Sequence, residues 1–173
     1  PLATEAGIEV LRSGGNAMDA AIACCFATGV VEPNSATIGG GGYIVYQVGD
    51  NGGVIGGHMP SSKQSRPDMF KLTGKDSTGA IGFGWAEVEG NANIEGYLSI
   101  NVPGVVSAMC ESHKLFGRLP FSEVIAPAIR LAREGFSPHW HNLYAFGLLS
   151  DMLYKYDELG RIFLPNGAMP IGD

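Results

Sequence analysis

Four consecutive glycines, Gly39, Gly40, Gly41 and Gly42, lie within the segment NSATIGGGGYIVYQV at residues 34–48. An Ala-rich apolar segment precedes them, and an aromatic and β-branched run follows. Glycine loses more conformational entropy on folding than any other residue, so the run needs a physical reason. A phosphate-binding loop, a strand crowded against a catalytic centre and a flexible linker are the three alternatives.

Phosphate binding does not fit the position of these glycines. A P-loop ends in Gly-Lys-Ser/Thr and opens a helix, whereas here the glycines open a predicted strand. The only Gly-Lys pair lies in TGKDS at residues 73–77 and lacks the required hydroxyl residue. The dinucleotide fingerprint likewise needs its glycines after a strand and before a helix. The sequence therefore predicts no nucleotide site.

Metal binding is equally poorly supported. His139 and His141 flank Trp140, but no HExxH motif and no Cys/His pair with zinc spacing occurs. The spacing favours a partly exposed aromatic cluster over a pair of ligands. We therefore expect neither a metal nor another cofactor.

A nucleophile needs an adjacent base, and only Cys110 and His113 have a spacing that could bring such a pair together on one helix face. A core cysteine beside a surface histidine is the simpler interpretation. No GxSxG motif is present. From its residues alone, the chain has no complete catalytic site.

The composition excludes some classes of partner. The net charge is −6 and no Lys/Arg cluster occurs, which argues against nucleic acid. The longest uncharged apolar stretch, residues 20–31, is too short to cross a membrane. Charged residues make up only 16%, so either the glycines dilute them or some surface is covered by a partner. Cys24 and Cys25 are predicted to be buried free thiols, which favours a reduced, cytoplasmic compartment over a periplasmic or secreted one.

The elements that must position these residues follow from periodicity and turn signals. Asn16 is expected to cap a buried helix with Asp19 in its first turn, and Pro33 to end it. The segment GDNGG predicts a hairpin turn. Pro127 should kink or divide its helix. The expected helices are 3–12, about 17–31, 104–116, a helix capped by Ser122 within 119–136, and 138–158. The expected strands are 43–48, 53–57 and 97–104, with a loop from 59 to about 93.

Three ordered segments resemble the γ-glutamyltranspeptidase family. They are PLATEAGIEVLRSGGNAMDAAIACCFATGVVEPNSATIGGGGYIVYQV, VPGVVSAMCESHKLFGRLPFSEVIAPAIRLAREGF and FLPNGAMPIGD. Together they cover nearly the whole chain except the loop at about 60–93, and such an ordered set is highly specific.

The resemblance implies an N-terminal-nucleophile (Ntn) hydrolase with an α+β fold, part of an αββα four-layer sandwich. In that family the precursor cuts itself, and the new N-terminal threonine of the small subunit forms an acyl-enzyme from an amide. The acyl group then passes to water or an amine. Residues 1–173 resemble only the N-terminal part of the large subunit, a single incomplete domain. The expected partners are a small amide substrate, the rest of the large subunit and the small subunit with the nucleophile.

By the same resemblance, Gly39 to Gly42 shape the substrate pocket, where side chains would intrude. His58 lies where the family carries an arginine that grips the α-carboxylate of the γ-glutamyl group. Histidine lacks the planar, permanently charged fork of arginine. Arg66 is a further candidate, and His58 as a filler at a strand end is the simpler alternative. The substrate is therefore γ-glutamyl or another small amide, and a catalytically dead binding homologue is the rival hypothesis.

Overall fold

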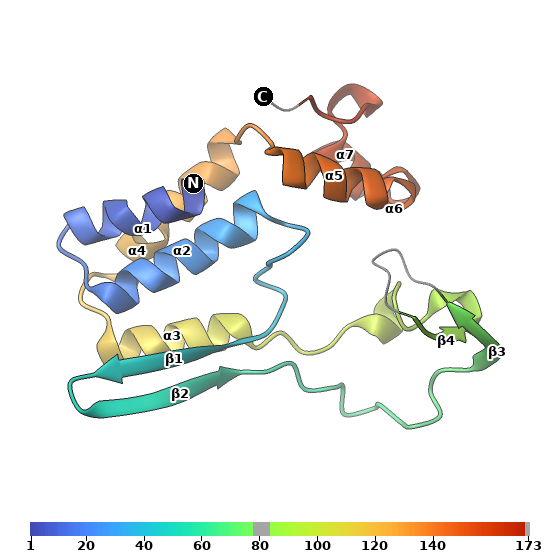
Figure 1. Cartoon of the computed structure of the whole chain (residues 1–173), viewed down its shortest axis with the longest axis horizontal. Coiled ribbons are helices and arrows are strands. Elements are labelled where there is room, and N and C mark those ends of the chain that lie inside the picture. Colours follow the sequence, from blue (N-terminus) through green and yellow to red (C-terminus); the bar gives the residue numbers. More distant parts are fainter. Residues whose placement is uncertain (78–83, 172–173) are drawn as a thin grey trace.

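The computed structural model describes residues 1–77 and 84–171 and has an α+β architecture (Figure 1). Helices α1, α2 and α4 form one layer, and α3 lies between this layer and the β1–β2 hairpin. The predicted α+β class is confirmed. The bounds of these elements are α1 Leu2–Arg12, α2 Ala17–Val31, α3 Val105–Phe116, α4 Phe121–Glu134, β1 Gly42–Val48 and β2 Asn51–Gly57.

Local signals set the start of α2 as predicted. The side chain of Asn16 accepts hydrogen bonds from the backbone N–H groups of Met18 (3.0 Å) and Asp19 (3.1 Å). The carboxylate of Asp19 accepts one from the backbone N–H of Asn16 in return (2.9 Å). This reciprocal pair satisfies N–H groups that have no partner within the helix. The helix ends at Val31, two residues before Pro33.

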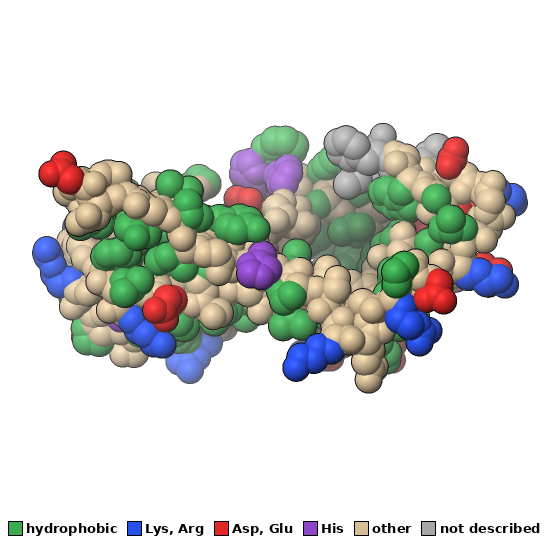
Figure 2. Space-filling model, turned by 90° about the horizontal axis from the view of Figure 1, so that it is seen from below, with side chains coloured by type: hydrophobic (Ala, Val, Ile, Leu, Met, Phe, Trp, Pro, Cys, Tyr) green, Lys and Arg blue, Asp and Glu red, His purple; other side chains and the backbone are tan. Residues whose placement is uncertain are grey.

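The hairpin is covered on one face only. Its strands are antiparallel, with Val45 opposite Val54 and Tyr43 opposite Gly56. Ile44 points to the other face and packs against the core beside α3. Because side chains alternate along a strand, Tyr43, Val45 and Val54 share the uncovered face, where they are 67%, 78% and 62% exposed. Figure 2, seen from the hairpin side, shows hydrophobic side chains gathered over this part of the molecule.

Three hydrophobic clusters hold the helices together. The largest joins α1, α2, α3 and α4, a second joins α1, α2 and α4, and a third joins the C-terminal helices. Their buried members are Val10, Ile22, Ala23, Met109 and Val124; Ala6, Ala27 and Ala128; and Phe146, Leu153 and Leu164. No helix within the described ranges is both long and apolar enough to cross a bilayer.

The loop predicted from 59 to about 93 is wrong in part, because it contains the antiparallel strands β3 (Leu72–Ser77) and β4 (Trp85–Val88). Their pairing is irregular between Leu72 and Asp76, and Gly74 has a φ of +81° there. These strands are defined by backbone pairing, and their residues do not alternate between apolar and polar. The sequence therefore contains no periodic pattern that predicts them. Residues 78–83 of the predicted loop lie outside the described residues.

The strand predicted at 97–104 is also wrong. Residues Tyr97–Ser99 form a 3₁₀ turn, η2, and extended chain follows. The extended chain donates one backbone hydrogen bond, from Val102 N–H to the Pro60 carbonyl (3.0 Å), but it joins no sheet among the described elements. Tyr97 is 95% exposed, so no core contact stabilises a strand here.

The helix predicted at 138–158 is three short helices. The backbone leaves helical geometry at Leu149 and at Tyr156. These two bends fold the segment back on itself, so that side chains from it meet in the third cluster. In contrast, the predicted division at Pro127 does not occur: α4 continues as one helix through this residue, whose ring is buried. The predicted cap at Ser122 is also wrong, because the N-cap is Pro120 and Ser122 lies within the first turn. The remaining bounds are α5 Trp140–Leu148, α6 Ser150–Lys155, α7 Asp157–Phe163, η1 Glu89–Asn91 and η3 Pro165–Gly167.

The cysteines are free, but they are less buried than predicted. Cys25 is exposed on α2, and Cys24 and Cys110 are half-buried. Partial burial and the neighbouring Cys24 raise the pKa of the Cys25 thiol. The expectation of a wholly buried α2 is therefore wrong, because no described element covers its side at Cys25.

Candidate functional site

Three backbone segments meet where the glycine run enters β1. The carbonyl of Gly40 accepts hydrogen bonds from the N–H groups of Gly104 (3.1 Å) and Val105 (3.2 Å). It thereby satisfies N–H groups at the start of α3 that have no partner within that helix. We call this region the glycine junction, and it consists of residues 40–42, 57–60 and 102–105.

Crowding at the junction requires glycine at three positions. A Cβ atom on Gly104 would overlap the carbonyl oxygen of His58. One on Gly57 would lie 2.8 Å from the Cβ of Ala108, and one on Gly41 would lie 2.8 Å from the carbonyl oxygen of Gly57. These contacts explain why the backbones of β1, β2 and α3 can approach so closely.

The other glycines of the run have more room. A Cβ on Gly39 would lie 3.6 Å from Thr37 Oγ1, and one on Gly42 would lie 3.8 Å from Val105. A Cβ on Gly40 would meet the Thr37 carbonyl at 3.3 Å, a tight but small conflict. Crowding among the described residues therefore explains Gly41, and the pocket-shaping role of the whole run stays a prediction.

His58 follows β2 at the same junction. Its side chain is exposed, and among the described residues its ring has no hydrogen bond or ion pair. His58 as a filler at a strand end stays the alternative prediction. Arg66, the other candidate, forms an ion pair with Asp68 (3.4 Å) and lines a separate cavity.

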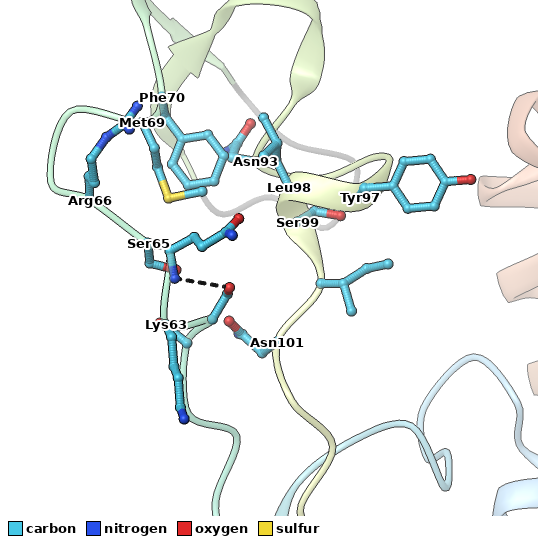
Figure 3. A pocket seen from close by; sticks show the side chains of 14 residues that line it. Lys63, Ser65, Arg66, Met69, Phe70, Asn93, Tyr97, Leu98, Ser99 and Asn101 are labelled. Atoms are coloured by element: carbon cyan, nitrogen blue, oxygen red, sulfur yellow. Dashed lines mark hydrogen bonds between the residues drawn. The ribbon is translucent and has the colours of Figure 1, made fainter.

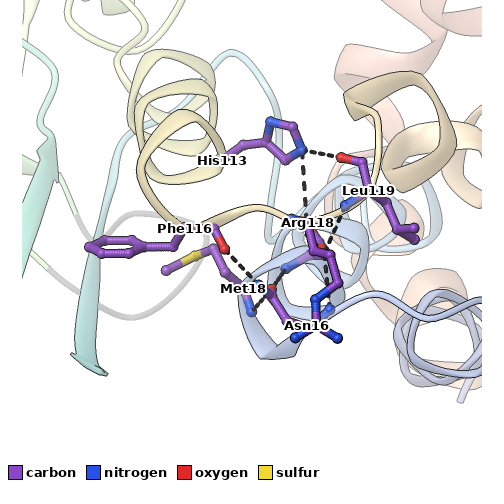
Figure 4. Close-up of polar contacts among 7 residues, drawn as sticks. Asn16, Met18, His113, Phe116, Arg118 and Leu119 are labelled. Carbon is purple, nitrogen blue, oxygen red and sulfur yellow. Dashed lines mark hydrogen bonds and ion pairs between the residues drawn. The ribbon is translucent and has the colours of Figure 1, made fainter. Parts of the chain in front are cut away.

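A buried carboxylate ties the helical layer to the turn after α3 (Figure 4). Asp19 is fully buried, and its two oxygens accept hydrogen bonds from the backbone N–H of Arg118 (3.1 Å each). Its Oδ2 also accepts one from the N–H of Leu119 (3.3 Å). From the other side, the Asn16 amide donates to the Phe116 carbonyl (2.6 Å). Sequence reasoning placed Asp19 in the first turn of the helix but missed these contacts, because Arg118 and Leu119 lie about one hundred residues away.

The same turn also binds His113, the residue considered above as a possible base for Cys110. His113 Nε2 lies 2.8 Å from the Leu119 carbonyl and 3.7 Å from Asp19 Oδ1. Because a carbonyl oxygen only accepts, Nε2 carries a proton and donates it there. That nitrogen therefore holds the turn after α3, which gives His113 a structural role, and no hydrogen bond joins its ring to Cys110 among the described residues.

His139 and His141 form the predicted aromatic cluster with Trp140. The ring centroids of neighbouring members are 5.6 and 5.7 Å apart, and Trp140 is 64% exposed. A search of the described ranges finds no group of three or more His, Cys, Asp or Glu side chains placed to hold a metal ion.

The match to a known family covers almost the whole chain. The family model described as gamma-glutamyltranspeptidase matches residues 3–171. The chain belongs to the γ-glutamyltranspeptidase family.

Curated relatives in the family have two kinds of name. Glutathione hydrolase 3 of Arabidopsis thaliana is 33% identical over 96% of this chain, and acylase ACY 1 proenzyme of Pseudomonas sp. (strain V22) is 36% identical over 96%. The matched regions are 24% and 29% of those relatives. The chain thus spans about a quarter of the length of the curated relatives it matches.

Solved structures of the family share the fold. The γ-glutamyltranspeptidase of Helicobacter pylori matches with a TM-score of 0.85 at 31% identity, over 100% of this chain and 47% of that one. The transpeptidase CapD of Bacillus anthracis matches with a TM-score of 0.73 at 31% identity, over 100% of this chain and 50% of that one. The family predicted from sequence is confirmed.

Proposed function

We propose that this chain is part of an amidohydrolase or acyltransferase that cleaves γ-glutamyl or similar small amide bonds. The acyl-enzyme forms on an N-terminal threonine downstream of residues 1–173, as the family resemblance implies. The match of the family model over residues 3–171 carries this proposal, and relatives named glutathione hydrolase support it. The described residues contain no complete catalytic set. This is consistent with a nucleophile supplied by another part of the protein.

In this proposal the glycine junction forms one wall of the substrate site. The Gly40 carbonyl and the tight contacts of Gly57 and Gly104 fix the end of β2, and with it the position of His58. His58 is exposed and unpaired among the described residues, so its ring is available to hydrogen-bond a substrate acyl group. A histidine ring offers one or two such bonds.

A second candidate is an amidase that acts on a small amide other than a γ-glutamyl compound. The 36% identity to an acylase proenzyme favours it, as does a cephalosporin acylase of Bacillus halodurans, which matches with a TM-score of 0.78 at 26% identity. Histidine at position 58 is consistent with this candidate because a carboxylate-binding fork is missing. A binding homologue without the threonine is the third hypothesis, and it predicts neither self-cleavage nor turnover.

The test of substrate class is the full-length protein assayed with γ-glutamyl anilide and simple acyl anilides, next to His58→Arg. Charge-assisted hydrogen bonds contribute about 1.5–3 kcal/mol each. At 1.4 kcal/mol per decade, the arginine variant is expected to gain about 10- to 100-fold in γ-glutamyl preference measured as kcat/KM. The unmodified enzyme should show little preference.

The control for this experiment is His58→Ala. Strong γ-glutamyl selectivity in the unmodified enzyme, unchanged in His58→Ala, would show that another residue grips the carboxylate. Absence of both self-cleavage and anilide hydrolysis in the full-length protein would support the binding homologue instead.

We further infer that the rest of the large subunit and the small subunit cover the bare hairpin face. The exposed apolar side chains of Tyr43, Val45 and Val54 stand together there, and exposed patches of this kind mark interaction surfaces. In a four-layer sandwich, a second sheet packs on that face about 10 Å away.

Residues 1–173 expressed alone are therefore expected to aggregate or to remain molten, without amidase activity. The apolar hairpin face and the exposed side of α2 have nothing to pack against in that case. Dye binding by exposed apolar surface and size-exclusion chromatography measure this outcome. A monodisperse monomer with a cooperative thermal transition would contradict it.

A further inference from the structure

The last turn of α2 is held by a side chain from α5. Val31 is the final residue of α2, and its carbonyl has no partner within that helix. The Nδ2 group of Asn142 donates a hydrogen bond to this carbonyl (2.9 Å), and the Oδ1 atom of the same side chain accepts one from the backbone N–H of His139 (3.0 Å). Asn142 is 2% exposed, so the contact is shielded from water. One buried amide thus joins the end of α2 to the start of α5.

Residues 32–39, which we call the connector, lead from this carbonyl to the glycine junction. They form hydrogen-bonded turns. The carbonyl of Glu32 accepts a hydrogen bond from the N–H of Ser35 (3.0 Å), and the carbonyl of Thr37 accepts one from the N–H of Gly40 (3.1 Å). At the far end, the Gly40 carbonyl is bound by the start of α3. The connector is therefore a continuous series of short contacts, through which a displacement at one end reaches the other.

On its other side the glycine junction is open. Pro60 and Val102 share a backbone hydrogen bond (3.0 Å). Beyond this bond, the segments that carry Lys63 and Asn101 lie on either side of a cavity of about 1050 Å³ (Figure 3). Because these segments separate around a cavity, packing on that side does little to fix the glycine run. Its position depends on the connector and on α3.

The packing beside the Asn142 contact is also incomplete. A second cavity, of about 540 Å³, lies between the end of α2, the end of α4 and the C-terminal helices. Apolar side chains from all three line it, among them Val30, Leu131, Phe146 and Phe163. Apolar burial is non-directional, whereas a hydrogen bond has a defined length and angle. The hydrogen bond of Asn142 therefore sets how the end of α2 lies against α5.

We propose that Asn142 is a positioning residue for the substrate site. It holds the last carbonyl of α2, the connector passes this position on, and the glycine junction thereby keeps Gly41 and His58 in place. The role of the junction as a wall of the site rests on the function proposed above. The contact between Asn142 and α2 does not.

Asn142→Asp in the full-length protein is the decisive variant. Its carboxylate keeps an oxygen for the N–H of His139 but has no hydrogen to donate to the carbonyl of Val31. Hydrogen–deuterium exchange, measured by mass spectrometry, should then be about 5- to 100-fold faster in the peptide that covers residues 32–41, because a buried acceptor has lost its donor. Asn142→Ala introduces no charge and should act in the same direction.

Asn16→Asp is the matched control. The Asn16 amide also donates to the last carbonyl of a helix, that of Phe116 in α3 (2.6 Å), and its substitution makes the same change of charge. Asn16 lies at the opposite end of α2, so this control should leave exchange in residues 32–41 unchanged. Equal exchange in that peptide for both Asn142 variants and the control would overturn the proposal.

Kinetics with the acyl anilides separate positioning from folding. Well below the denaturation midpoint of each variant, Asn142→Asp should raise KM about 3- to 30-fold and change kcat less, because one wall of the site moves while the rest stays in place. Faster exchange with both kinetic constants unchanged would show that Asn142 is structural only and would overturn its positioning role. If the unmodified full-length protein hydrolyses no anilide, the proposed function fails, while the exchange experiment still decides whether Asn142 holds the connector.

Discussion

Asp19→Ala should lower the free energy of unfolding of the full-length protein by about 3–5 kcal/mol, because it removes one partner of a buried, charge-assisted network. The carboxylate is fully buried and accepts backbone hydrogen bonds from Asn16, Arg118 and Leu119. The variant leaves these N–H groups without a partner and leaves a cavity. Urea denaturation followed by tryptophan fluorescence measures the change.

Glu9→Ala is the matched control for this experiment. Glu9 also carries a carboxylate on the helical layer, but it pairs with Arg130 at the surface, where both side chains are about half exposed. The control should therefore change stability little. Asp19→Asn should recover only part of the loss, since its NH₂ group would face backbone donors. A denaturation midpoint for Asp19→Ala equal to that of the control would show that the network contributes no stability.

Gly104→Ala is the second substitution expected to have a large effect, and it should destabilise the protein by about 2–4 kcal/mol through overpacking against backbone. The added Cβ would overlap the His58 carbonyl and the backbone of Gly57, neither of which has a flexible end that could move aside. Gly104 has a φ of −115°, which alanine also adopts, so the effect is steric rather than conformational. The loss should appear in the denaturation midpoint and in kcat/KM, because the end of β2 carries His58.

The control is Gly39→Ala, whose Cβ would make an ordinary contact with Thr37 Oγ1 at 3.6 Å. Its stability should match that of the unmodified protein. A loss of activity at unchanged stability would support the pocket-shaping role expected for Gly39. Full stability of Gly104→Ala would contradict the close approach of β2 and α3.

Short-range patterns in the sequence were reliable where the cause of the structure is local. The capping box of Asn16 and Asp19 involves residues three positions apart, and the β1–β2 turn needs only the residues of GDNGG. Pro33 prevents further helix because proline has no N–H to donate. Such features require no knowledge of the rest of the chain.

Predictions failed where distant contacts outweighed local preference. The apolar residues of 138–158 have helical spacing, yet the segment bends at Leu149 and Tyr156 so that Phe146, Leu153 and Leu164 can meet. The burial gained in this cluster opposes the preference for one continuous helix. In β3 and β4 the backbone pairs without an apolar pattern, and the sequence therefore offered no signal.

The sequence by itself determined the family and the α+β class, because the ordered motifs can be recognised without a structure. It also determined the start of α2, because the hydrogen bonds there join residues close together in the chain. Only the tertiary structure decided which glycine of the run is crowded, since that depends on Gly57 and Met59 lying next to Gly41. It also decided that Asp19 holds the turn at Arg118. Each of these contacts joins residues far apart in the chain, and their proximity arises only when the layers pack together.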